Sequence, residues 1–166
     1  MDIESFKKLT IDMGHFTPMF FMFYSFFHGI FYKNPYMISL SILTWVDFRY
    51  IGPYMKKISR NKGWATPRPF CKSINQAHGC NGMPSGHTQT MALIFSYILS
   101  YTLVNKKEYE NYFMIFISFI GFIFMGFQRV FSNMHTPQQV FYGGTIGVLL
   151  GPVFVFILKT FGKILK

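Results

Sequence analysis

The stretch Gly82-Met83-Pro84-Ser85-Gly86-His87 lies between long apolar runs, and the other informative residues are arranged around it. A Pro-Ser-Gly turn that leads into a helix presents free backbone N–H groups and the positive end of the helix dipole, which attract anions. His87, in the first turn of that helix, is placed to give a proton to a bound anion. A histidine from another segment, such as His135, could attack that anion. The stretch therefore predicts a phosphate-binding helix start that takes part in phosphoryl transfer.

The composition is that of a membrane protein. Hydrophobic residues make up 51% of the 166 residues and charged residues only 13%, and the 22 Phe and 11 Met gather in long uncharged runs. The formal net charge of +10 lies mostly between these runs, where it would meet lipid headgroups, fix the topology or bind a phosphorylated substrate. Because no continuous polar surface carries this charge, we expect membrane lipids and no nucleic acid as partners.

The apolar runs predict an all-α, multi-pass transmembrane bundle with about five spans in one domain, 1–166. The predicted spans are 13–32, 36–55, 85–104, 111–128 and 137–161. Residues 1–12 would form a short interfacial helix, and the long basic segment 56–84 would be a site loop, since such loops are usually functional or disordered. Five spans would place 1–12, 56–84, Ser85 and 129–136 on one membrane face.

Three local patterns add detail. Thr136-Pro137-Gln138-Gln139 is typical of a helix start, with Thr as N-cap, Pro in the first turn and Gln in a capping box. In the last span Gly143, Gly147 and Gly151 recur every four residues and predict close helix packing, either inside the bundle or between two copies of the chain. Cys71 and Cys80 share the site loop and could be disulfide-bonded, free or simply packed.

Three cations are candidates for binding a phosphoryl group. Lys62 and Arg68 come just before the Ser85 turn, and Arg129 is the first charged residue after an uncharged span. Arginine binds phosphate with two parallel hydrogen bonds and lysine acts as a point charge, so together they would neutralise charge in the transition state. Each cation taken alone could equally be a charge that fixes the topology.

These residues resemble the three-part signature of the type 2 phosphatidic acid phosphatase (PAP2) superfamily of membrane phosphatases. The three ordered blocks are Lys62-x5-Arg68-Pro69, Pro84-Ser85-Gly86-His87 and Arg129-x5-His135. Finer details are similar to dolichyl-diphosphatase-like members, namely Arg68-Pro69-Phe70-Cys71, the run 82–89 and the run 129–144. The resemblance covers about 62–150 and implies a polyprenyl diphosphate or a related lipid phosphate as substrate.

The resemblance also implies a role for each site residue. His135 would be the nucleophile that forms a phosphohistidine, and His87 would protonate the departing oxygen. The other oxygens of the phosphoryl group would be held by Lys62, Arg68, Arg129, Ser85 and the Gly86 N–H. No metal and no cofactor are expected in this scheme. A neutral and a protonated histidine can coexist around a dianion, because the anion raises the proton affinity of its neighbour.

The signature departs from the family pattern at its first and third blocks. Five residues separate Lys62 from Arg68 where six is usual, so Lys57 or Arg60 could take the place of Lys62. Gln128 stands where the family commonly has serine, which removes one hydroxyl from the expected ligands.

A further departure concerns the partner of the nucleophile. Gln139 stands where many members have an aspartate, and an amide can accept a hydrogen bond from His135 without stabilising an imidazolium as a carboxylate does. Gln139 could orient His135 or serve only the capping box. Asp47 is the candidate acid in place of that aspartate, because it is an acidic residue near a span end on the site face. The alternative is that its side chain simply extends to the membrane interface, as charged side chains near span ends often do.

The sequence thus predicts an integral membrane lipid phosphatase, resident in the endoplasmic reticulum if the protein is of eukaryotic type. The alternatives are a lipid phosphotransferase of the same fold, a degenerate member that binds phospholipid without turnover, and a structural multi-pass protein. A zinc set of Cys71, His78, Cys80 and His87 matches no ligand spacing. Once the candidate phosphate ligands are set aside, Lys and Arg are nearly balanced between the two faces, so the positive-inside rule assigns no side.

Overall fold

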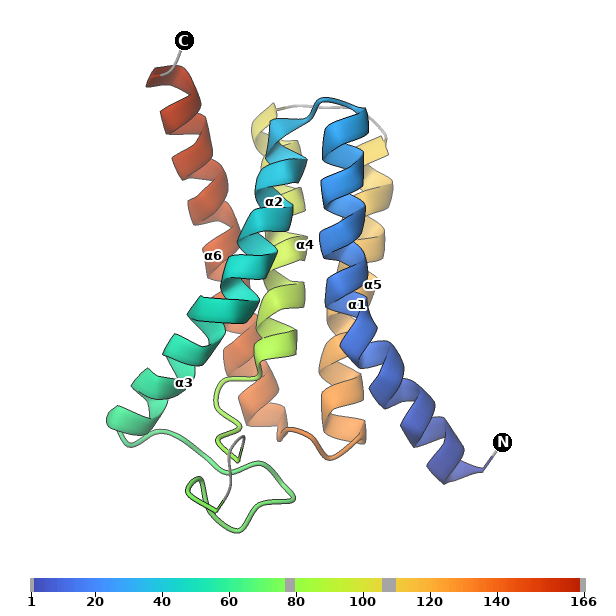
Figure 1. Ribbon diagram of the computed structural model, residues 1–166, viewed down its shortest axis with the longest axis vertical. Helices are drawn as coiled ribbons and strands as arrows, with labels where there is room; N and C mark the ends of the chain where they lie inside the picture. The colour runs from blue at the N-terminus through green and yellow to red at the C-terminus, as the bar shows by residue number, and fades with distance from the viewer. Residues whose placement is uncertain (1, 77–79, 106–109, 165–166) are drawn as a thin grey trace.

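The computed structural model describes residues 2–76, 80–105 and 110–164, and it is a bundle of helices (Figure 1). The elements are α1 (Ile3–Phe31), α2 (Pro35–Val46), the π-helix η1 (Asp47–Ile51), α3 (Gly52–Asn61), α4 (Gly86–Asn105), α5 (Glu110–Phe131) and α6 (Pro137–Ile164). The all-α prediction is confirmed, since the described ranges contain no named strand and one isolated bridge, between Pro67 and Asn81.

Helix α4 is the centre of the bundle and contacts α1, α2, α5 and α6 (Figure 1). It is buried on several sides, as expected for a helix that is surrounded by others. Met91, Leu93, Ile94 and Tyr97 are completely buried there. The position of His87 in its first turn is therefore fixed by the best-packed helix of the molecule.

Helix α6 packs against α4 through the glycines that recur every four residues. A Cβ atom at Gly143 would collide with the carbonyl oxygen of Ser85, and one at Gly147 would collide with the backbone of α4 at Gln89. The Ser96 hydroxyl donates to the Gly147 carbonyl oxygen across the same seam, at 3.1 Å. This small-residue face thus serves packing inside the bundle, one of the two predicted alternatives.

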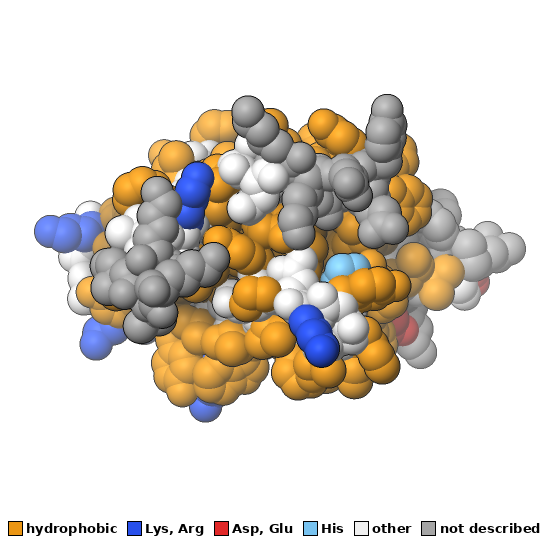
Figure 2. Space-filling model, turned by 90° about the horizontal axis from the view of Figure 1, so that it is seen from above, with side chains coloured by type: hydrophobic (Ala, Val, Ile, Leu, Met, Phe, Trp, Pro, Cys, Tyr) orange, Lys and Arg blue, Asp and Glu red, His pale blue; other side chains and the backbone are white. Residues whose placement is uncertain are grey.

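Much of the outer surface is apolar. Two helices in the described ranges are long and apolar enough to cross a membrane, as judged by length and composition: Tyr112–Phe131 and Pro137–Phe161. Figure 2 shows the end of the bundle away from the site loop, where hydrophobic side chains cover much of the surface and Lys and Arg are scattered. The count of five spans stays a prediction.

The second predicted span differs from the structure. Instead of one helix over 36–55 followed by a loop, α2 passes through the π-helix η1 into α3, which continues to Asn61. Helix α3 is amphipathic, with Ser59 buried and Lys57 and Arg60 at its surface, so it remains helical in what was predicted to be loop. The helix ends where Gly63 adopts a φ of 74°, a conformation that favours glycine.

Two other predicted helix boundaries differ from those in the structure. Residues 3–12 are the first turns of α1 and not a separate helix, with Asp2 as N-cap through a 2.7 Å hydrogen bond from the Ser5 N–H. Helix α5 continues to Phe131, so Arg129 is in its last turn and not in the following connection. The N-terminus, α3, the site loop, the start of α4 and the α5–α6 connection still lie at one end of the bundle, as predicted (Figure 1).

Candidate active site

Both predicted histidines, His87 and His135, line one cavity at this end of the bundle. The cavity has a volume of about 450 Å³. His87 comes from the start of α4 and His135 from the connection before α6. The remaining lining residues come mainly from η1, α3, the site loop and α4: Asp47, Phe48, Gly52, Pro53, Lys56, Lys57, Arg60, Arg68, Asn81, Gly86 and Thr90. The fold therefore brings together residues that are far apart in the chain.

Gln139 holds the ring of His135. Its Oε1 lies 3.0 Å from His135 Nδ1. Its Nε2 donates to the Thr66 hydroxyl at 2.9 Å and to the Pro67 carbonyl oxygen at 2.8 Å. Since those partners fix the amide with its oxygen toward the imidazole, Nδ1 must carry the proton to make a hydrogen bond. Nε2 of His135 is then left with a free lone pair.

The surroundings of His135 keep it neutral. Its side chain is 3% exposed. This burial, followed by the positive charges of Arg68 and Lys56, lowers the pKa of His135 to about 3, and the hydrogen bond to Gln139 opposes the shift. A neutral imidazole with a free Nε2 is the form that can act as a nucleophile at neutral pH.

The half-buried Arg68 and the buried Arg129 bring positive charge close to His135. Arg129 is only 2% exposed, and its Nε and Nη2 are buried without a hydrogen-bond partner, as is the Nε of Arg68. Arg129 does not belong to the cavity wall, but its charge acts on His135 and on Lys56. Buried cations without an acceptor cost free energy unless they serve an anion, so this arrangement suits a phosphoryl group.

Lys56 is the site residue that the sequence reasoning missed. It lines the cavity, and its ammonium group donates to the Asn81 carbonyl oxygen at 3.3 Å. Burial and the charges of Arg68 and Arg129 lower the pKa of Lys56 to about 8. By contrast, the predicted ligand Lys62 is exposed at the C-cap of α3 and lies outside the cavity wall.

If residues 52–61 had been predicted to form a helix, Lys56 could have been predicted to share a helix face with Lys57 and Arg60. The alternatives considered for Lys62, namely Lys57 and Arg60, do line the cavity. On a helix, residues 56, 57 and 60 lie on neighbouring parts of one face. The cavity wall thus contains three cations of α3 and not Lys62.

Ser85 and Gly86 contribute differently from each other. Ser85 is completely buried, its N–H donates to the Gln139 carbonyl oxygen at 3.0 Å, and its hydroxyl pairs with Thr88 at 3.0 Å. Ser85 therefore joins the starts of α4 and α6. Gly86 lines the cavity and has open space where a Cβ would be, so an anion can approach the backbone at this helix start.

Asp47 lines the same cavity, but its carboxylate is bonded to α4. Oδ1 accepts from the Gln89 amide at 2.6 Å and Oδ2 from the Thr90 hydroxyl at 2.7 Å. The contact with His135 Nδ1 belongs to Gln139 instead. Asp47 is thus placed to hold η1 against the first turns of α4.

Gln128 lies away from the cavity wall. It is completely buried, its Nε2 donates to the Ser132 hydroxyl at 3.3 Å, and its amide fills the space beside Gly14 of α1. Its place in the structure is packing between α1 and α5.

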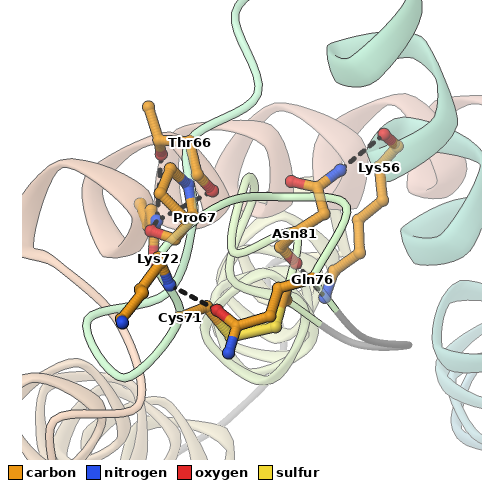
Figure 3. The surroundings of a disulfide bond; sticks show 9 residues. Lys56, Thr66, Pro67, Cys71, Lys72, Gln76 and Asn81 are labelled. Atoms are coloured by element: carbon orange, nitrogen blue, oxygen red, sulfur yellow. Dashed lines mark hydrogen bonds between the residues drawn. A yellow bond between two sulfur atoms is a disulfide. The ribbon is translucent and has the colours of Figure 1, made fainter.

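The site loop is tied together by a disulfide between Cys71 and Cys80, one of the three alternatives left open by the sequence (Figure 3). Both cysteines are also hydrogen-bonded to the backbone of Arg68. The Arg68 N–H donates to the Cys80 carbonyl oxygen, and the Arg68 carbonyl oxygen accepts from the Cys71 N–H, both at 2.9 Å. Asn81 then ties the loop to α3 by donating to the Lys56 carbonyl oxygen at 2.9 Å. The disulfide rules out Cys71 and Cys80 as zinc ligands, and His78 lies outside the described residues.

Comparisons with known proteins identify the family of this chain. The sequence pattern of the PAP2 superfamily matches residues 55–163. The chain is similar to lipid phosphate phosphatase delta from Arabidopsis thaliana, with 28% identity over 102 residues that cover 52% of this chain. The chain spans only 24% of the length of that relative. No solved structure matches the chain. The match of the family pattern over well more than half of the sequence shows that this chain belongs to the PAP2 superfamily.

Proposed function

We propose that this chain hydrolyses a lipid phosphate or diphosphate at a membrane surface, with a polyprenyl diphosphate of the dolichyl type as the favoured substrate. The observation that carries the proposal is the shared cavity of His87 and His135, which also contains Lys56 and Arg68. The apolar helices and the family indicate a membrane protein. The name of the plant relative supports a lipid phosphate as the substrate class.

In the first step, Nε2 of His135 attacks the phosphorus atom and the bond to the leaving oxygen breaks. His87 gives that oxygen a proton, so the product leaves as an alcohol or as a lipid monophosphate. Lys56, Arg68 and the positive end of the α4 dipole at Gly86 neutralise the other phosphoryl oxygens. Gln139 keeps the proton of His135 on Nδ1 throughout.

In the second step, water attacks the phosphohistidine. His87, now neutral, takes a proton from this water, and the bond between phosphorus and Nε2 breaks to release inorganic phosphate and restore His135. The side-chain cations supply the charge neutralisation for both steps, so we propose a reaction without a metal ion. A dolichyl-type substrate would place the protein in the endoplasmic reticulum of a eukaryotic cell.

The test is phosphate release by the purified chain from prenyl diphosphates, phosphatidate and soluble phosphate esters, in the presence of a chelator. We expect His135→Ala and His87→Ala each to lower kcat by about a hundredfold or more. His28→Ala is the control, because His28 stacks between Tyr24 and Tyr32 away from the cavity.

A labelled lipid phosphate should also leave an acid-labile phosphoryl group on the wild type and on His87→Ala, but not on His135→Ala. Loss of activity in chelator would contradict the metal-free scheme. Transfer of label to an added alcohol, in place of release to water, would identify a phosphotransferase. Binding without any turnover would identify a degenerate member.

A further inference from the structure

A second, apolar chamber adjoins the catalytic cavity. It has a volume of about 170 Å³ and lies between α1, α2, η1 and the start of α4. Its lining consists of Phe16, Pro18, Met19, Met22, Thr44, Trp45, Phe48, His87 and Thr90. Three of these residues, Phe48, His87 and Thr90, also line the catalytic cavity, so the two spaces share a wall.

The chamber offers apolar surface and few polar groups to a ligand. The Thr44 hydroxyl donates to the Leu40 carbonyl oxygen of its own helix at 2.8 Å. The Thr90 hydroxyl donates to Asp47 at 2.7 Å. Phe48 meets the ring of His87 edge to face, with 5.7 Å between the ring centres. A hydrocarbon is the ligand that this lining suits.

The rim of the chamber belongs to the outer surface of the helices. Phe16 is 68% exposed, and Met19 and Trp45 are 49% and 50% exposed. These residues come from α1 and α2, so the chamber lies toward the side of the bundle that would face lipid. A lipid chain that enters the chamber from the bilayer would meet Phe48 and His87 before it reached the cations of the catalytic cavity.

We propose that this chamber binds the first carbons of the lipid chain while the phosphoryl group occupies the catalytic cavity, with Phe48 at the junction. The inference rests on the proposed function of that cavity and adds the subsite that selects substrates with a long apolar chain. Each methylene group buried in such a site raises affinity about fourfold. Phosphate esters with long chains are therefore preferred over short ones.

The kinetic test compares butyl, octyl and dodecyl phosphate as substrates of the purified chain in one detergent. Octyl phosphate should exceed butyl phosphate in kcat/KM by about tenfold or more in the wild type. Met19→Gln and Met22→Trp should each remove about tenfold of this preference. Met13→Gln is the matched control, since Met13 is on the same helix, is 50% exposed and does not line the chamber.

A binding test does not depend on turnover. In Trp64→Phe, Trp45 is the remaining tryptophan of the two in the chain. A dodecyl phosphonate brominated near its head group should quench Trp45 fluorescence saturably, and an equally brominated alcohol should not. Met19→Gln should weaken this quenching.

The outcomes separate the two proposals. If no ester is hydrolysed but the phosphonate quenches Trp45 saturably, the proposed reaction fails and the chain-binding chamber stands. If butyl phosphate is hydrolysed but chain length has no effect, or Met19→Gln behaves like Met13→Gln, the chamber does not bind the lipid chain. Quenching by the alcohol equal to that by the phosphonate would lead to the same conclusion.

Discussion

Gln139 combines two tasks in one side chain. Its Oε1 accepts from the Thr136 N–H at 3.1 Å, as a capping box requires, and lies 3.0 Å from His135 Nδ1. Its Nε2 is tied to the site loop at Pro67. Gly82 also packs closely against the Gln139 amide, because a Cβ atom at position 82 would collide with it. His135, the proposed nucleophile, is thus oriented by a residue that also caps the start of α6.

Replacing Gln139 by leucine separates these tasks when it is compared with Thr136→Ala. Both changes remove part of the cap, which should cost about 1 kcal/mol of stability, and Gln139→Leu should cost more because it also removes the bonds to Thr66 and Pro67. Only Gln139→Leu frees the His135 ring, so we expect it alone to lower kcat about tenfold to a hundredfold. The measurements are phosphate release and thermal unfolding of the purified variants. An equal loss of kcat in Thr136→Ala would show that Gln139 matters only for the helix start.

The pH dependence of kcat/KM should follow the protonation state of Lys56. Its pKa is lowered to about 8 by burial and by Arg68 and Arg129, so in the free protein its positive charge is present below pH 8 and is lost above it. We therefore expect kcat/KM to fall as the pH rises through about 8. Lys56→Arg should move this fall to higher pH because a guanidinium stays protonated. Lys56→Met should lower kcat/KM about tenfold or more at pH 7.

The control for Lys56 is Lys62→Met, which removes an exposed charge outside the cavity wall. It should leave the pH profile and kcat/KM nearly unchanged. If Lys62→Met is as damaging as Lys56→Met, the lysine of the signature, and not Lys56, binds the phosphoryl group.

These residues also show how far the sequence could predict the site. The spacing and order of the motifs were enough to predict that His87, Arg68 and His135 come from separate segments and share a site. Lys56 could not be found in the same way, because it faces the cavity only if residues 52–61 are helical. The contact of Gln139 with Pro67 joins segments whose relative placement no local pattern fixes.

At the scale of helices, the seam between α4 and α6 determines the position of the helix start that carries His87. Gly147→Ala would place a Cβ atom against Gln89 and Ala92 of α4, where the backbone cannot yield easily. We expect it to cost about 1–3 kcal/mol of stability. The effect is measured by thermal unfolding in detergent.

Gly126→Ala is the matched control for the seam. The new Cβ atom would meet only the Val140 side chain, at 3.3 Å. Since alanine favours helix over glycine, the stability should stay within about 1 kcal/mol of the wild type. Equal losses in the two variants would show that the α4–α6 seam is not especially close.

The segment α2–η1–α3 explains why the second span was predicted incompletely. Its apolar run ends near Val46, while the helical backbone continues through the π-helix and α3 to Asn61. Periodicity indicates a helix but not the change to π geometry, which begins at Asp47, where the carboxylate accepts from Gln89 and Thr90 of α4. These contacts join segments that are far apart in the chain, so no local pattern could predict them.

At the scale of the whole molecule, the helices alternate in direction, so the site loop and the α1–α2 turn lie at opposite ends of the bundle (Figure 1). The nearly balanced Lys and Arg residues left the side of the site undecided, but the Cys71–Cys80 disulfide within the site loop is informative. Disulfides persist mainly in oxidising compartments. We therefore expect the catalytic cavity to face away from the cytosol.

Thiol labelling with a reagent that does not cross membranes tests this orientation. When only the cytosolic face is made accessible, Cys71 and Cys80 should remain unlabelled even after a reductant that is also confined to that face. Tyr32→Cys with both native cysteines changed to serine is the control, since Tyr32 is 72% exposed in the turn at the other end of the bundle and should be labelled. Labelling of Cys71 and Cys80 from the cytosolic side would place the cavity there. In that case the loop around Arg68 would have to be held by its hydrogen bonds to Cys80 and Cys71, without a lasting disulfide.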